Sequence, residues 1–183
     1  MIFYASYMTM KRPSHDIQPL IPADQLAARI KTLAREIEDD YAGGEFVVIG
    51  VLKGAFIFMA DLVRAFRKPV RCDFLRVSSY DHDRSTGVVR LDLDLTQPIA
   101  DQDVLLVEDI VDTGRTLRYL LKHLQAKRPS RLRVASLLYK ELYPEVRGLI
   151  DYCGFTIPNK YVLGYGLDSE GLYRSLPFVG YRE

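Results

Sequence analysis

Hydrophobic side chains recur at helical spacing after Pro22. Successive apolar residues lie four, three and four positions apart, which places them on one face of an amphipathic helix. The residues on this face are Leu26, Ile30, Leu33 and Ile37. Gly43 and Gly44 end the pattern. Further helices are predicted from Ala55 to Phe66 and from Thr116 to Leu124, where leucines form a similar stripe.

Continuous apolar runs of strand length lie between these helices. The run from Phe46 to Leu52 is rich in β-branched residues, as expected for a strand that is covered on both faces. Residues 89–95 instead alternate between apolar and polar, which predicts a strand with one face in water. The other predicted strands cover residues 70–77, 103–107 and 133–139. This alternation of strand and helix is typical of an α/β fold with a central, mainly parallel sheet flanked by helices.

The chain changes character from Leu149 onward. Short β-like pieces are interrupted there by glycine and proline, which indicates a small irregular subdomain. We therefore predict a single domain over residues 13–183, with a core from about 24 to 148 and a hood formed mainly by 149–183. Residues 1–12 are predicted to be a flexible leader.

Composition and charge narrow the function classes. A length of 183 residues suits one domain, and a net charge of +1 provides no global field that would hold a nucleic acid. Two cysteines cannot build a disulfide framework or a four-ligand zinc site, so a reducing, cytoplasmic setting is expected. The longest uncharged stretch covers only the first ten residues, which is too short to span a membrane. Cys72 alternates inside a predicted strand and is expected in the core.

Acidic residues lie at the end of one predicted buried strand. Glu108 and Asp109 follow the apolar run, and residues 112–116 (Asp-Thr-Gly-Arg-Thr) then lead into the next helix. Open parallel sheets bind ligands at the carboxyl ends of their strands. The turn offers successive backbone N–H groups, two hydroxyls and a helix N-terminus, which together suit a phosphate.

The acidity of this turn distinguishes it from other phosphate-binding loops. The Gly-x-x-x-x-Gly-Lys pattern of nucleotide-binding loops does not occur here, and carboxylates beside a phosphate need another partner. Paired sugar hydroxyls and a divalent cation would meet that need, so a sugar phosphate is the expected ligand. The simpler interpretation, in which the acids only cap the helix, explains one acid better than three acids within five residues.

The run from Val107 to Thr116 resembles the phosphoribosyl pyrophosphate signature of the type I phosphoribosyltransferases, and its form is similar to the hypoxanthine-guanine branch. Further matches follow in one order along most of the chain. They are Val51-Leu-Lys-Gly54, residues 78–87 in a polar loop, Val134–Lys140, and Gly164–Asp168 followed by Tyr173-Arg174. The resemblance implies the type I phosphoribosyltransferase fold. It also implies transfer of a 5-phosphoribosyl group from phosphoribosyl pyrophosphate to hypoxanthine or guanine, with release of pyrophosphate.

The resemblance also implies a role for each matching residue. Asp112 would be the general base that takes the proton from purine N7. Glu108 and Asp109 would hold the ribose hydroxyls, and the 5-phosphate would be held by the rest of the loop, which is Asp112, Thr113, Gly114, Arg115 and Thr116. The pyrophosphate would be bound by Lys53, Gly54, Ser79, Tyr80 and Arg174. The Ser79–Tyr80 loop would close over the reacting sugar, which would exclude water.

The resemblance implies that the purine lies under the hood and that a metal lies beside it. Lys140 would donate to the 6-oxo group, Tyr161 would stack on the ring, and the backbone at Val162 and Asp168 would line its edge. The implied cofactor is Mg²⁺, with Glu108, Asp109 and Asp168 as its ligands. Tyr161 and Ser169 replace a phenylalanine and a tyrosine of the mammalian pattern, which leaves the fine base preference open.

Two alternative functions remain at this point. One is a phosphoribosyltransferase that prefers xanthine, and the other is a regulatory protein that keeps the fold and binds nucleic acid. The near-neutral charge disfavours the second, because such a protein needs a basic face or an added module. We expect phosphoribosyl pyrophosphate and a 6-oxopurine as partners, no nucleic acid and no membrane. The resemblance also implies a homodimer or homotetramer, and the helix from Ala55 to Phe66 offers more apolar surface than one face needs.

Overall fold

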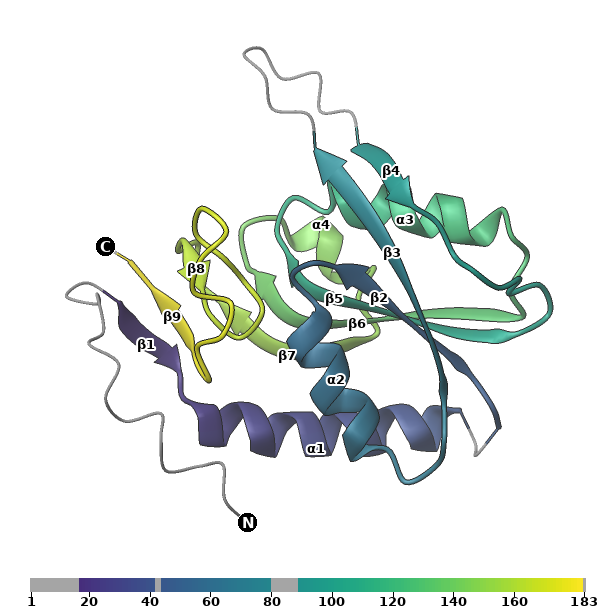
Figure 1. Cartoon of the computed structure of the whole chain (residues 1–183), viewed down its shortest axis with the longest axis horizontal. Helices are drawn as coiled ribbons and strands as arrows, with labels where there is room; N and C mark the ends of the chain where they lie inside the picture. The colour runs from purple at the N-terminus through teal and green to yellow at the C-terminus, as the bar shows by residue number, and fades with distance from the viewer. Residues whose placement is uncertain (1–16, 42–43, 80–88, 183) are drawn as a thin grey trace.

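The computed structural model describes residues 17–41, 44–79 and 89–182 (Figure 1). Its main sheet has six strands in the order β4-β3-β2-β5-β6-β7, all parallel except the edge strand β4. These strands are β2 (Val47–Leu52), β3 (Arg71–Ser79), β4 (Val89–Leu93), β5 (Asp103–Val111), β6 (Arg131–Lys140) and β7 (Tyr152–Ile157). The predicted α/β class with a central, mainly parallel sheet is therefore confirmed.

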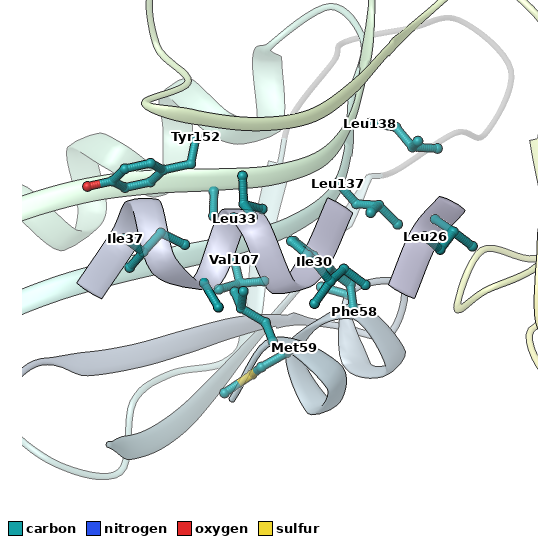
Figure 2. Packing of buried hydrophobic residues seen from close by; sticks show 14 of the residues in the cluster. Leu26, Ile30, Leu33, Ile37, Phe58, Met59, Val107, Leu137, Leu138 and Tyr152 are labelled. Atoms are coloured by element: carbon teal, nitrogen blue, oxygen red, sulfur yellow. The ribbon is translucent and has the colours of Figure 1, made fainter. Parts of the chain in front are cut away.

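Helices cover both faces of this sheet. On one face, α1 (Ala23–Asp40) and α2 (Phe56–Ala65) pack on β5 and β6, where Leu33, Phe58 and Val107 lie in one cluster (Figure 2). On the other face, α3 (Arg115–Gln125) and the short α4 (Pro144–Arg147) cover the second cluster. The helical stripe predicted after Pro22 is fully buried, and each such side chain contributes about 1.5–3 kcal/mol to stability.

The hood contains a second, smaller sheet. It has the order β1-β9-β8, with β1 (Gln18–Ile21) antiparallel to β9 (Val179–Tyr181) and β9 antiparallel to β8 (Val162–Leu163). The hood therefore takes a strand from each end of the described chain (Figure 1). Because β7 pairs with β6, residues 152–157 of the predicted hood segment belong to the main sheet.

Most predicted strands differ from the observed ones by one to three residues. The exception is β5, which continues through Glu108 and Asp109 to Val111, so both acids lie within the strand and not after it. The prediction for Cys72 was wrong because the inward face of β3 carries Asp73 and Leu75, which leaves the thiol exposed. The predicted leader, residues 1–12, lies outside the described residues. None of the helices in the described ranges is long and apolar enough to cross a membrane.

Candidate active site

The turn between β5 and α3 forms a small polar cavity. Its volume is about 100 Å³, and its walls are Glu108 and residues 110–117. The helix α3 begins at Arg115, so the first N–H groups of a helix face this turn and have no partner inside the helix. Thr113 and Arg115 are exposed, whereas Thr116 is partly buried. The N–H of Arg115 donates to Oγ1 of Thr113 at 3.5 Å. The cavity therefore combines backbone donors at the start of a helix with the hydroxyls expected for an anion.

Gly114 shapes this turn through its backbone. Its φ angle is +72°, a left-handed conformation that residues with a Cβ adopt only at a cost. A Cβ at this position would also lie 2.6 Å from Cγ1 of Val146, a buried residue of α4. Glycine is thus required both for the conformation of the loop and for the packing of α4 beneath it.

Two carboxylates lie next to each other at the end of β5. Burial raises the pKa of Glu108 well above its usual range, and the neighbouring Asp109 raises it further. Burial also raises the pKa of Asp109 to about 6, although the backbone N–H of Ile110 donates to its Oδ1 at 2.9 Å and opposes the shift. Neither side chain has a salt bridge among the residues that the structure describes. Such a pair of oxygen ligands suits hydroxyl donors or a hard cation.

The loop after β2 lies against Asp109. A Cβ at Gly54 would overlap the Asp109 carboxylate, so only glycine allows the two segments to approach this closely. The peptide bond between Leu52 and Lys53 is cis. Lys53 is exposed, and within the described ranges its ammonium has no ion-pair partner. It is therefore available to an anionic ligand beside Asp109.

A second loop, from the hood, reaches the same place. A Cβ at Gly166 would overlap the carbonyl of Gly54, which shows direct contact between the two loops. Arg174 donates to the carbonyl oxygen of Gly166 at 2.6 Å and forms an ion pair with Oδ1 of Asp168 at 2.6 Å. The charges of Arg174 and Asp168 also act on the pKa of Asp109, in opposite directions. The hood thus brings one cation and one further carboxylate to the strand ends.

Asp112 and Lys140 face each other across the ends of β5 and β6. Nζ of Lys140 lies 3.0 Å from Oδ2 of Asp112, and the two side chains are 14% and 43% exposed respectively. A mostly buried ammonium is thus held beside a carboxylate that remains open to solvent. Because Lys140 has three N–H donors, it can keep this contact and still donate to a ligand.

Tyr161 directly precedes β8 of the hood sheet, and Val162 is the first residue of that strand. The Tyr161 side chain is 57% exposed, and its hydroxyl donates to the carbonyl oxygen of Asp168 at 3.3 Å. Val162 is buried and pairs with Tyr181 of β9. The exposed ring is therefore held by its hydroxyl next to the loop that carries Asp168, and its apolar surface is not covered.

The model of the phosphoribosyl transferase domain family matches residues 22–170. The chain belongs to the phosphoribosyl transferase family. Its hypoxanthine-guanine character is supported by curated relatives of high identity. A hypoxanthine-guanine phosphoribosyltransferase of Mycobacterium avium is 47% identical over 88% of this chain and 83% of its own length. A hypoxanthine phosphoribosyltransferase of Salmonella typhimurium is 41% identical over 91% of this chain and 95% of its own.

Solved structures of phosphoribosyltransferases are similar over nearly the whole chain. A hypoxanthine-guanine phosphoribosyltransferase of Bacillus anthracis has a TM-score of 0.82 and 41% identity, and the match covers 91% of this chain and 97% of the other. A variant of the Trypanosoma cruzi hypoxanthine phosphoribosyltransferase in complex with the product IMP has a TM-score of 0.85 and 40% identity, with 94% and 93% covered. The expected type I phosphoribosyltransferase fold is confirmed.

The structure of this phosphoribosyltransferase brings together most of the predicted site residues. Lys53, Gly54, Asp109, Asp168 and Arg174 meet through the contacts described above. Tyr80 lies outside the described residues, as do residues 81–87 of the loop that is expected to close over the reacting sugar, and the side chain of Ser79 is not described either. Sequence reasoning missed Ile110 and Val146, which line or support the cavity, because an apolar residue in a strand or short helix resembles any other core residue.

Proposed function

We infer that this chain is a purine salvage enzyme that transfers the 5-phosphoribosyl group of phosphoribosyl pyrophosphate to hypoxanthine or guanine. The products are IMP or GMP and pyrophosphate. The relatives that are 41–47% identical carry this activity in their names. The observation that carries the inference is the acidic end of β5, which continues into the anion-binding turn before α3.

The turn and the two acids bind different parts of the sugar phosphate. We propose that the 5-phosphate occupies the cavity at residues 112–116, where it accepts hydrogen bonds from backbone N–H groups. Glu108 and Asp109 accept hydrogen bonds from the ribose hydroxyls. Their raised pKa supports this role, because a buried carboxyl pair gains most from donors or a cation that compensate its charge.

We propose that Asp112 acts as the general base. Its carboxylate is open to solvent on one side and contacts Nζ of Lys140 on the other. As purine N9 attacks the anomeric carbon, the Asp112 carboxylate takes the proton from N7. The bond to the pyrophosphate oxygen breaks in the same step, so negative charge leaves with pyrophosphate and positive charge develops on the sugar.

The pyrophosphate leaves from the side of the sugar opposite to the attacking base, and cations are needed there to balance its negative charge. Lys53 and Arg174 are proposed to meet it, together with the backbone at Gly54. The donor set also fits Mg²⁺, because carboxylate oxygens of Glu108, Asp109 and Asp168 are the hard ligands that this ion prefers. No three acidic, histidine or cysteine side chains converge on one point within the described ranges. Such a site suits an ion that is held by one or two carboxylates and the substrate phosphates, and that neutralises charge on the leaving group.

We assign recognition of the base to the end of β6 and to the residues around the start of β8. Lys140 donates to the 6-oxo group, which favours hypoxanthine and guanine over the 6-amino group of adenine. The exposed ring of Tyr161 stacks on the purine, and the backbone at Val162 and Asp168 lines its edge. Neither the xanthine-preferring alternative nor the nucleic-acid-binding one gains support from the relatives.

Steady-state kinetics with hypoxanthine, guanine, xanthine and adenine test this function. The expected result is high kcat/KM for hypoxanthine or guanine with phosphoribosyl pyrophosphate and Mg²⁺, and a much lower value for adenine. A preference for xanthine would favour the first alternative. A preference for adenine would contradict the role of Lys140.

We also propose that the enzyme is a cytoplasmic homodimer or homotetramer. Phe56 of α2 is 40% exposed and Phe74 of β3 is 37% exposed. Met59 of α2 and the Phe74 ring both lie over Gly50, so α2 packs beside β3, and we propose that a second copy covers the exposed Phe56 and Phe74. The two cysteines are unpaired, as suits a reducing compartment. Light scattering after size-exclusion chromatography, with Phe56→Lys as the variant that should dissociate, measures the assembly.

A further inference from the structure

Tyr165 connects the hood to helix α2. It is 6% exposed, and its hydroxyl donates to the Oδ2 carboxylate oxygen of Asp61, which lies 104 residues earlier in the chain. The other oxygen of Asp61 is bound by Arg64, one turn further along α2. The acceptor is therefore fixed by its own helix. Tyr165 also has a positive φ angle of 51°, so this turn departs from the conformation that a tyrosine prefers.

The residue after Tyr165 leads directly to the proposed pyrophosphate site. Gly166 lies against the carbonyl of Gly54, and its own N–H donates to the carbonyl oxygen of Arg174 at 2.9 Å. The Arg174 guanidinium in turn donates to the carbonyl oxygen of Gly166 and pairs with Asp168. The backbone of Tyr165 is bound in the same way, since its N–H donates to the carbonyl oxygen of Leu176 at 2.9 Å.

We propose that Asp61 and Tyr165 are positioning residues, whose hydrogen bond holds the loop with Asp168 and Arg174 against the Lys53–Gly54 loop. Neither side chain touches the substrate. The proposal rests on the pyrophosphate and metal roles assigned above to Arg174 and Asp168. Without the tether, Gly166 would lose its fixed distance from Gly54, and Arg174 would lose the carbonyl that orients its guanidinium. A small displacement of a charged group at such a site has a large effect on binding of the transition state.

The alternative is that this hydrogen bond only stabilises the fold. The chain offers a matched control for that reading, because the hydroxyl of Tyr152 donates to Oδ2 of Asp40 at 2.7 Å. Tyr152 is also 6% exposed, its partner also lies on a helix far away in sequence, and neither residue belongs to the proposed site. Tyr152→Phe and Tyr165→Phe therefore remove the same chemical contact at two distances from the active site.

The experiment compares these two variants in thermal unfolding and in steady-state kinetics. Both should lower the melting temperature by similar amounts. Only Tyr165→Phe should raise the KM for phosphoribosyl pyrophosphate, by about tenfold, which corresponds to one hydrogen bond to a charged group. Its effects on the KM for hypoxanthine and on the affinity for IMP should be clearly smaller, since neither ligand contains pyrophosphate and this loop reaches the base only through the backbone at Asp168.

Further variants separate the possible failures. Asp61→Asn should weaken the tether, and the double variant Asp61→Asn/Tyr165→Phe should show less than the sum of the two single effects. Equal KM values for phosphoribosyl pyrophosphate in Tyr152→Phe and Tyr165→Phe would overturn the tether while leaving the transferase function intact. If Arg174→Ala also left this KM unchanged, the role of Arg174 would be wrong, and the tether would fail with it.

Discussion

Replacement of Asp109 by asparagine should raise the stability of the folded protein and also raise its KM for phosphoribosyl pyrophosphate. Burial raises the Asp109 pKa from 3.8 to about 6, so the folded protein favours the uncharged carboxyl. A difference of about two pKa units corresponds to about 3 kcal/mol. Above about pH 6 the buried Asp109 carboxylate is ionised and lowers the free energy of unfolding of the wild-type chain by about this amount. An asparagine at this position has no charge to bury.

The sign of the pH dependence follows from the raised pKa. Between about pH 4 and pH 6 the folded state keeps a proton that the unfolded chain has released, so wild-type stability falls as the pH rises through this window. The advantage of Asp109→Asn should therefore be about 3 kcal/mol at about pH 8 and about half of that at about pH 5. In a chain of 183 residues this is roughly 6–12 °C in melting temperature at the higher pH.

Calorimetry or denaturant unfolding at the two pH values measures this difference. Asp94→Asn is the matched control. Burial raises the pKa of Asp94, but hydrogen bonds from Lys127 and His123 outweigh burial and lower this pKa to about 2. Loss of the Asp94 carboxylate should therefore destabilise the fold. In the same samples, Asp109→Asn should raise the KM for phosphoribosyl pyrophosphate. A variant no more stable than wild type at about pH 8, or an advantage that does not change with pH, would refute the reasoning.

Two further substitutions test the loop and the base site. Gly114→Ala should lower the free energy of unfolding by about 2 kcal/mol or more, because it forces a Cβ into a left-handed backbone and against Val146. It should also raise the KM for phosphoribosyl pyrophosphate. Thermal unfolding and kinetics measure the two effects, and a wild-type melting temperature would contradict the prediction. Lys140→Gln should raise the KM for hypoxanthine by about tenfold or more and reduce the preference for hypoxanthine over adenine, because it removes a charged donor. Kinetics with both bases measure this preference. An unchanged ratio of kcat/KM for the two bases would show that Lys140 does not recognise the 6-oxo group.

The central sheet could be predicted because its buried strands coincide with continuous apolar runs in the sequence. The end of β5 could not, since Glu108 and Asp109 break the apolar pattern while pairing with β6 continues as far as Val111. The strand β1 was not predicted either. It has only four residues, includes a proline, and exists because β9 from the other end of the chain pairs with it.

The site could be predicted where its residues are neighbours in sequence. The loop 112–116 is one continuous motif, so its anion-binding chemistry is visible in the sequence alone. The contact between Asp112 and Lys140 and the approach of Gly54 to Asp109 depend on how loops from different strands pack. No local pattern encodes such contacts. The same is true of Tyr165 and Asp61, which join the hood to α2.

The most direct measurement compares turnover and substrate binding in Asp112→Asn. If Asp112 takes the N7 proton at the reacting centre, kcat should fall by about 10²–10⁴-fold, while the Kd for phosphoribosyl pyrophosphate from calorimetry stays within a few-fold of wild type. The hydrogen-bonding oxygen and the backbone of the loop remain in this variant, so binding should survive. Wild-type turnover in Asp112→Asn would remove Asp112 from the reaction and contradict the proposed mechanism.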